Sequence, residues 1–282
     1  MNCLLVIVAA LAGLLGAVRP ALADTPAPLV LTFGVVPQQA ATDLARAWTP
    51  VLAYLSSKTG YTLEFRTAQD VVTFERRVEN GEFDFAYYSP LHYVAYRASG
   101  YQAMAKERDT LLVGIVVVPK DSGTKSLKDL NGATMAFPSP LAFAATTLPQ
   151  LLLKQMGVSV VPKYVASHES VYRTVARGLY PAGGGILKTY EQVDPAVRDR
   201  LRILWKSRPY APHPIAVHRR VPKVVVQRVL AALLAMADDS NGAQLLKEAG
   251  FKGFVSAKDS DYDDIRALQV RIGQSGTEPK DK

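Results

Sequence analysis

Cysteine is almost absent from this chain, and its one cysteine stands close to the N-terminus. Among the 282 residues only Cys3 is a cysteine, and it opens an apolar run. A lipoprotein cysteine follows such a run instead of opening it, so no lipid anchor is expected here. A mature chain without this segment has no cysteine at all, which excludes disulfides, thiol catalysis and cysteine metal ligands.

Long hydrophobic runs are also missing, except at the N-terminus. Residues 4–18 are almost uninterruptedly apolar, and Ala21-Leu22-Ala23 stands before Asp24 as a small-x-small cleavage pattern. We therefore predict a signal peptide over residues 1–23, cleaved after Ala23, and a periplasmic protein. The segment before the run lacks Lys and Arg, so an uncleaved anchor is the alternative. No other segment approaches the roughly 18 apolar residues of a membrane span, which predicts a soluble mature chain.

The charge pattern and the motifs exclude several further classes of protein. The net charge is +8, but the basic residues are scattered, so no nucleic-acid partner is expected. The four histidines form no metal motif, because no pair has the i, i+4 spacing or an acidic partner. The chain has no nucleophile elbow, no P-loop and no dinucleotide fingerprint. We expect no cofactor and no enzymatic activity.

What the chain does contain is a regular alternation of strand and helix patterns. Short connections between them predict parallel βαβ units, with both faces of each sheet covered. Pro162 marks its strand as an edge strand or an irregular one. The expected strands cover residues 29–36, 61–67, 84–88, 111–118, 134–137, 158–165, 201–206 and 215–218, and the expected helices cover 43–59, 70–80, 90–99, 142–156, 167–178, 223–236 and 242–249.

The alternation restarts after Pro119, which predicts an α/β protein with two lobes. We expect residues 24–119 and 215–270 in lobe 1, residues 120–214 in an inserted lobe 2, and a disordered tail over 271–282. Ligands of open α/β sheets bind beyond the carboxyl ends of the strands. A ligand cleft between the lobes follows.

The stretch of residues 167–191 is the first candidate for that cleft. It joins a polar helix start, Ser167 and His168, to an amphipathic helix and then to the glycines at 183–185. A helix N-terminus offers unpaired N–H groups and a partial positive charge, and glycine permits close approach of the backbone. A small anionic ligand suits such a segment. His168 can donate to an oxyanion or cap its own helix, and Lys188 can contact the anion or stay in solvent.

Three other segments are candidates for the same cleft. Tyr88 and Ser89 stand where a strand ends and a helix begins, but Tyr88 can equally be core and Ser89 an N-cap. The small residues of segment 139–147 would let a ligand approach a helix N-terminus, and His213 lies between two prolines where the chain crosses lobes. The complete set of predicted ligand-binding residues is Tyr88, Ser89, Ser139, Phe143, Ala144, Ala145, Thr146, Ser167, His168, Lys188 and His213.

At these positions the chain resembles the phosphate/phosphite/phosphonate-binding (PhnD-like) periplasmic substrate-binding proteins. The resemblance spans essentially the whole mature chain. It is carried by residues 33–37 (FGVVP), 47–60, 81–94 (GEFDFAYYSPLHYV), 125–137, 167–178 (SHESVYRTVARG) and 204–222. It implies a type II periplasmic binding protein fold, whose two lobes close on an oxyanion and deliver it to a membrane ABC permease. A monomer is expected.

The resemblance is uneven at the site. Ser167 and His168 match the Ser-His helix start of the family, and Tyr88 and Ser89 match its aromatic-then-small strand end. The Ser-Thr-Ser run that typically holds the phosphate in the family is replaced by the residues at 142–144 (Ala-Phe-Ala).

Acidic positions of the family also differ. Lys188 and His213 appear in place of acidic residues, and Pro181 stands where the family commonly has Asp. Each lost charge-assisted hydrogen bond would cost about 1.5–3 kcal/mol. The changes favour a fully ionised oxyanion, or another organic anion with an apolar part against Phe143. Two alternatives stay open, namely a sensor that partners a membrane histidine kinase and an enzyme of the same fold.

Overall fold

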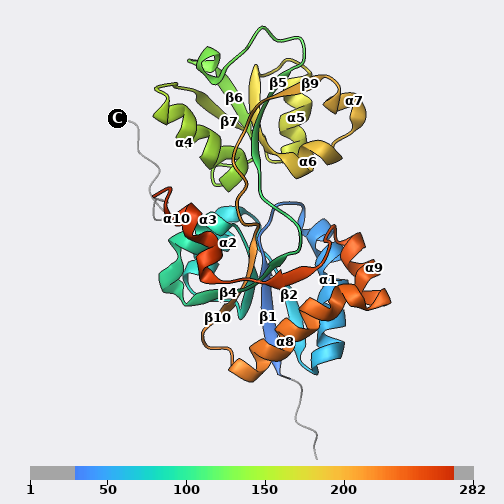
Figure 1. The fold of residues 1–282 in the computed structure, drawn as a ribbon. Helices are drawn as coiled ribbons and strands as arrows, with labels where there is room; N and C mark the ends of the chain where they lie inside the picture. The colour runs from blue at the N-terminus through green and yellow to red at the C-terminus, as the bar shows by residue number, and fades with distance from the viewer. Residues whose placement is uncertain (1–28, 270–282) are drawn as a thin grey trace, which may run out of the picture.

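Two β-sheets organise the computed structural model, which describes residues 29–269. The six-stranded sheet has the order β11-β4-β10-β3-β1-β2, and the five-stranded sheet has the order β7-β6-β8-β5-β9. Figure 1 shows the sheets as two separate lobes, lobe 1 below and lobe 2 above, joined by two crossing segments. The predicted two-lobed α/β architecture is confirmed.

Lobe 1 contains the six-stranded sheet. Strand β1 is parallel to β2 and β3, whereas β10 is antiparallel to β3 and β4. Its strands are β1 (Val30–Val35), β2 (Thr62–Arg66), β3 (Phe85–Tyr87), β4 (Tyr101–Glu107), β10 (Pro214–His218) and β11 (Phe254–Ser256). Its helices are α1 (Ala41–Thr59), α2 (Val71–Glu79), α3 (Pro90–Ala95), α8 (Lys223–Ala235), α9 (Ser240–Glu248) and α10 (Asp263–Arg266), with short 3₁₀ turns at Arg97–Ser99, Met236–Asp238 and Asp259–Tyr262.

Lobe 2 contains the five-stranded sheet, in which β5 is antiparallel to β8 and β9 and β6 is parallel to its neighbours. Its strands are β5 (Gly114–Pro119), β6 (Thr134–Phe137), β7 (Val161–Tyr164), β8 (Ala182–Ile186) and β9 (Leu201–Lys206). Its helices are α4 (Leu148–Gln155), α5 (His168–Ala176), α6 (Leu187–Gln192) and α7 (Pro195–Arg198), with a 3₁₀ turn at Leu127–Leu130 and a π-helix at Phe143–Thr147.

Each sheet is a central layer with a hydrophobic core on both faces. In lobe 1, one core packs β1 against α1 and α8, and the other joins α2, α3 and α10. The second of these cores also contains Phe143 and Leu148 from lobe 2. Apolar side chains therefore connect the lobes on this side of the molecule. The two cores of lobe 2 lie on the α5 side and the α4 side of its sheet.

The predicted lobe boundary after Pro119 is wrong. Strand β5 pairs with β8 and β9, so it belongs to the sheet of lobe 2 and not to lobe 1. The chain crosses between lobes just before β5 and again after β9, where Leu112 and Tyr210 form an antiparallel bridge. Their backbone N–H groups donate to each other's carbonyl oxygens at 2.9 and 3.0 Å. Pro119 marks the end of strand β5, but the pairing of β5 with distant strands decides to which lobe this strand belongs.

The sequence patterns also overstate how parallel the sheets are. Strands β4 and β11 were not predicted, and both add antiparallel neighbours to lobe 1. Strand β4 carries alanines and charged side chains, so it has no clear strand pattern. Strand β7 does lie at the edge of its sheet, which confirms the interpretation of Pro162. The predicted signal peptide and the predicted tail both fall outside the described residues, and within 29–269 no helix is long and apolar enough to cross a membrane.

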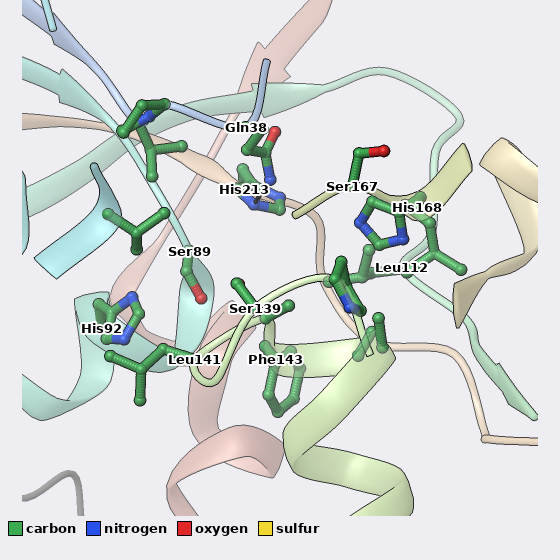
Figure 2. A pocket seen from close by; sticks show the side chains of 18 of the residues that line it. Gln38, Ser89, His92, Leu112, Ser139, Leu141, Phe143, Ser167, His168 and His213 are labelled. Atoms are coloured by element: carbon green, nitrogen blue, oxygen red, sulfur yellow. Dashed lines mark hydrogen bonds between the residues drawn. The ribbon is translucent and has the colours of Figure 1, made fainter. Parts of the chain in front are cut away.

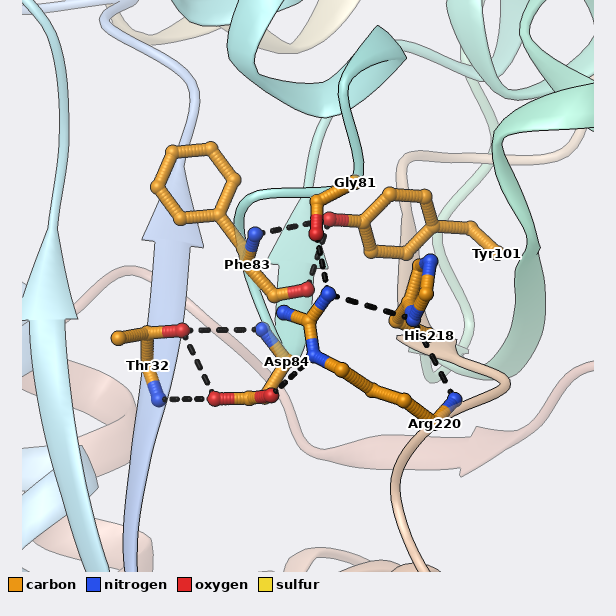
Figure 3. A network of polar contacts seen from close by, with 7 residues as sticks. All are labelled: Thr32, Gly81, Phe83, Asp84, Tyr101, His218 and Arg220. Atoms are coloured by element: carbon orange, nitrogen blue, oxygen red, sulfur yellow. Dashed lines mark hydrogen bonds and ion pairs between the residues drawn. The ribbon is translucent and has the colours of Figure 1, made fainter.

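A polar network ties the strands of lobe 1 together near the start of β3 and the end of β10 (Figure 3). The Asp84 carboxylate accepts hydrogen bonds from the backbone N–H and hydroxyl of Thr32 at 2.8 and 2.9 Å and from Nε of Arg220 at 2.8 Å. Arg220 also donates to the Gly81 carbonyl, and Tyr101 donates to the Phe83 carbonyl at 2.7 Å. The network joins β1 to the segments before β3 and after β10.

Burial raises the pKa of Asp84, but the hydrogen bonds from Thr32 and the Arg220 guanidinium outweigh it and hold that pKa below its ordinary value. We expect Asp84→Asn to destabilise the fold by about 1.5–3 kcal/mol, the range for hydrogen bonds to a charged group. The stabilisation by Asp84 is present above about pH 3.8 and is lost as the pH falls through the folded pKa. Urea denaturation at pH 7 measures the loss, and Asp43→Asn, which breaks an exposed pair with Arg46, is the control with an effect of at most about 0.5 kcal/mol. Equal effects of the two substitutions would contradict this assignment.

Candidate functional site

A cavity of about 90 Å³ lies between the lobes, at the carboxyl ends of β1, β3, β6 and β7 (Figure 2). Pockets for drug-sized ligands measure roughly 300–1,000 Å³, so this cavity suits a ligand of only a few heavy atoms. Lobe 1 supplies Val36, Pro37, Gln38, Val71, Ser89 and His92; lobe 2 supplies Pro138, Ser139, Leu141, Ala142, Phe143, Ala144, Ala145, Ala166, Ser167, His168 and Ile186; and Leu112 and His213 come from the crossing segments.

The polar side chains of this wall are hydroxyls, imidazoles and one amide. Three histidines, His92, His168 and His213, line the cavity, whereas none of the described lining residues is a carboxylate. Among residues 29–269, no group of three or more His, Cys, Asp or Glu side chains is placed to hold a metal ion. Such a wall attracts an anion through hydrogen bonds and partial charges.

His168 is the first residue of α5, and it does not cap its helix. Ser167 performs that role, since its hydroxyl accepts the backbone N–H of Ser170 at 3.1 Å. His168 Nδ1 is buried without a hydrogen-bond partner, and burial lowers the pKa of His168 to about 4. The imidazole is therefore neutral at pH 7 and free to contact a ligand. The first N–H groups of α5 lack acceptors within the helix and add partial positive charge.

Ser89 and Tyr88 differ in their placement. Ser89 precedes α3, but its side chain makes no capping bond, and its hydroxyl is buried at the cavity without a partner. Tyr88 is 1% exposed, packs against Tyr93 and Tyr101, and does not line the cavity. Tyr88 therefore packs in the core, in line with its alternative interpretation, and lies outside the cavity wall.

The loop before α4 forms a π-helix instead of the first turn of a continuous α-helix. The N–H of Thr147 donates to the Ala142 carbonyl, and the N–H of Leu148 donates to the Phe143 carbonyl, both five residues back. Pro149 follows and has no N–H to donate to Ala145. The carbonyls of Ala144 and Ala145 are thus released from the α-helical pattern, as is common for π-helices at functional sites.

Four of the five residues predicted in this loop line the cavity, namely Ser139, Phe143, Ala144 and Ala145. The fifth, Thr146, does not. Its side chain is fully buried, and its hydroxyl donates to the Ser139 carbonyl at 2.8 Å. Thr146 therefore closes the loop that presents the other residues. The ring of Phe143 packs at 80° to the ring of Tyr210, which fixes the apolar side of the cavity.

The glycines of β8 pack against protein, so the prediction that they approach a ligand is wrong. None of the glycines at 183–185 has a positive φ or lines the cavity. A Cβ on Gly184 would overlap with the Ala145 carbonyl oxygen, and a Cβ on Gly114 in β5 would overlap with the Ala144 carbonyl oxygen. These glycines let the π-helix rest directly on the sheet, and they position the cavity wall from behind.

Lys188 also lies outside the cavity wall. Its ammonium group is 3.0 and 3.3 Å from the two carboxylate oxygens of Glu107 and donates to the Gly250 carbonyl at 3.2 Å. Glu107 is 5% exposed and belongs to lobe 1, while Lys188 belongs to lobe 2. The predicted anion contact is thus an ion pair that links the lobes, and the buried carboxylate explains why a lysine stands here.

His213 lies where predicted, in the crossing segment at the cavity. Its ring stacks on Tyr87 with centroids 5.4 Å apart, and the side-chain amide of Gln38 donates to its Nε2 at 2.9 Å. Burial, together with the neighbouring His92, His168 and Lys188, lowers the pKa of His213 to about 3. A neutral ring is required to accept from an amide N–H. Sequence reasoning missed Gln38 and His92, because Gln38 lies in no helix-start pattern and His92 was considered only as a metal ligand.

The cavity wall, the two lobes and the paired crossing segments define a solute-binding protein of the type II periplasmic class. A family model for the periplasmic phosphonate substrate-binding proteins of ABC transporters matches residues 33–262. The chain belongs to this family, whose members bind solutes for transport.

Individual relatives agree with this assignment. The phosphate-import protein PhnD of Mycolicibacterium smegmatis is 23% identical over 276 residues, covering 85% of this chain and 84% of the relative. The structure of PhnD1 from Prochlorococcus marinus with methylphosphonate matches with a TM-score of 0.75 and 18% identity, covering 86% of this chain and 97% of that one. A binding protein of a phosphonate ABC transporter from Pseudomonas aeruginosa matches with a TM-score of 0.72 and 17% identity, covering 86% of each chain. These structures share the fold.

The support of the π-helix by β8 can be tested by Gly184→Ala. We expect a loss of stability of about 1–3 kcal/mol, the usual cost of overpacking, because the new Cβ overlaps with the Ala145 carbonyl and the Phe137 ring. Gly123→Ala is the matched control, since Gly123 has open space around it and no positive φ. Denaturation curves of the two variants measure their free energies of unfolding. An unchanged free energy of unfolding for Gly184→Ala would show that this contact does not hold the π-helix.

The lowered pKa of His168 has a consequence for the ligand-free protein. The folded protein favours the neutral form of His168. The contribution of His168 to the free energy of unfolding is therefore fully present above the ordinary pKa of about 6.5, and it is lost as the pH falls from 6.5 towards 4. We expect His168→Gln to reduce the decline of stability between pH 6.5 and 5, a range in which most carboxylates stay ionised. Thermal unfolding across this range measures the difference, and an unchanged slope would place His168 in solvent.

Proposed function

We propose that the cavity binds a small phosphorus oxyanion with a short apolar substituent, an alkylphosphonate above all, and that the protein delivers it to a membrane ABC permease. The observation that carries this proposal is the small interlobe cavity, whose described lining residues offer hydroxyl and imidazole groups beside helix N–H donors and include no carboxylate. The names of the relatives, which mention phosphate import and methylphosphonate, support the same class of ligand.

Donors from both lobes would surround the anion. Lobe 1 offers the unpaired Ser89 hydroxyl, and lobe 2 offers His168 and the N-termini of the π-helix and α5. Closure about such a site removes water, which strengthens each charge-assisted hydrogen bond. Binding therefore favours the state in which the lobes meet.

The apolar wall selects for a carbon substituent. By the family resemblance, Phe143 stands where a hydroxyl residue typically holds the phosphate, and Leu112, Leu141 and Ile186 also line the cavity. An inorganic phosphate would leave an oxygen against these side chains without a donor, which costs free energy. A methyl or ethyl group fits against them, so methylphosphonate and ethylphosphonate should bind more tightly than phosphate.

The proposal also includes how the protein reaches and meets its permease. The chain would be exported by a signal peptide cleaved after Ala23 and would act as a monomer, with the permease as its membrane partner. No turnover of the ligand is proposed. A sensor role with a membrane histidine kinase gains no support from the comparisons.

Thermal shift of the purified protein against phosphate, phosphite, sulfate, methylphosphonate and ethylphosphonate tests the proposal. A ligand at about 100 times its Kd stabilises the fold by about 2.7 kcal/mol, which is easily visible as a rise in Tm. We expect the alkylphosphonates to give the largest rise. An unmoved Tm with every anion would refute an oxyanion site.

Ser89→Ala separates ligand binding from folding. Removing a buried hydroxyl without a partner should raise the Tm of the ligand-free protein, while methylphosphonate binding weakens by about 10-fold, equivalent to one hydrogen bond of about 1.4 kcal/mol. Ser240→Ala, at an exposed position, is the control in which neither quantity changes. Isothermal titration calorimetry gives the Kd, and a lower Tm with unchanged Kd would assign Ser89 to folding alone.

A further inference from the structure

A buried acid–base pair stands behind the lobe 1 wall of the cavity. His92 Nδ1 of α3 lies 2.7 Å from Oε1 of Glu75 of α2, and their side chains are 1% and 2% exposed. The ring of Tyr96 stacks on His92 with centroids 5.8 Å apart and an interplanar angle of 15°. The imidazole is thus held from two sides.

Stability alone does not account for this pair. Taking a carboxylate and an imidazole out of water carries a large desolvation penalty, and well-packed apolar residues of similar volume often stabilise a core as much or more. Neither Glu75 nor His92 has any well-aligned hydrogen bond to another described residue. A second role for the pair would explain its presence.

The cavity supplies that role. Glu75 occupies the Nδ1 side of the ring, which leaves Nε2 as the nitrogen available to another group. Nε2 is buried without a hydrogen-bond partner, and so is the hydroxyl of Ser89, the residue that lines the same part of the wall (Figure 2). A carboxylate behind a histidine commonly fixes the orientation of its ring. Two unpartnered polar groups therefore meet the cavity from lobe 1.

We propose that His92, positioned by Glu75, is a specificity-determining contact for the ligand, and that Nε2 of His92 and the Ser89 hydroxyl together bind one oxygen of the anion. This inference rests on the proposed function and adds a residue to it. The loop of lobe 2 carries alanine and phenylalanine at 142–144 and has no side-chain hydroxyl at these three positions. The lobe 1 pair supplies donors on the opposite wall of the cavity.

The double variant Glu75→Leu with His92→Leu tests this directly. Both buried polar groups disappear together, so no unpaired charge is left in the core, and the fold should keep or gain stability. We expect the Kd for methylphosphonate to rise at least 10-fold relative to the parent. Glu79→Leu with Arg76→Leu, at two exposed positions of the same helix, is the matched control and should leave the Kd within 2-fold.

The outcomes are separable from those of the proposed function. A parent protein that binds no phosphorus oxyanion refutes the proposed function, and this inference falls with it. A parent that binds methylphosphonate and a folded double variant that binds it equally well refute only the contact by His92.

The positioning role of Glu75 has its own test. Glu75→Gln keeps a polar atom beside Nδ1 and should retain most of the affinity, whereas Glu75→Leu alone should lose it to the same extent as His92→Leu. Should the double variant fail to fold, His92→Gln decides the matter, because it retains a donor and is expected to bind more tightly than His92→Leu. Equal Kd values for these two His92 variants and the parent would overturn the proposal.

Discussion

The close contact between the π-helix and the glycines behind it is the constraint on which the site depends. The carbonyl oxygens of Ala144 and Ala145 rest where side chains of Gly114 and Gly184 would otherwise stand. The contact requires that these carbonyls accept no α-helical hydrogen bond. The i to i−5 hydrogen bonds of the π-helix and the missing N–H of Pro149 meet this requirement. The loop that lines the cavity is therefore held by backbone geometry, and its own side chains can vary in chemistry.

The relation between the lobes depends on a second set of contacts. The crossing segments pair with each other through Leu112 and Tyr210, and Lys188 reaches from lobe 2 to the buried carboxylate of Glu107. Phe143 joins an apolar core of lobe 1. The ion pair of Lys188 with Glu107 and the packing of Phe143 join residues of different lobes, so these two contacts favour the state in which the cavity is enclosed. Ligand binding and lobe contact support each other through the same equilibrium.

The distribution of donors gives this member of the family its own chemistry. Lobe 2 has no side-chain hydroxyl at 142–144 and contributes Ser139, Ser167 and His168 to the cavity wall. Lobe 1 contributes Ser89 and, in our proposal, His92. The wall combines apolar residues with hydroxyl and imidazole groups in both lobes, which in our proposal suits an anion that carries a short apolar substituent.

The sequence by itself determined the alternation of strands and helices, the two lobes, the edge position of β7 and the segments that border the cavity, because periodicity and helix-start patterns are local. Tertiary structure decided the rest. Strand β5 joined lobe 2 through pairing with distant strands, and the glycines of β8 faced a loop about forty residues away instead of a ligand. Lys188 lies outside the cavity wall because it pairs with Glu107, and Tyr88 lies outside it because it packs in the core. His92, in contrast, lines the cavity. Whether a polar side chain faces a ligand depends on what packs around it, which no local pattern records.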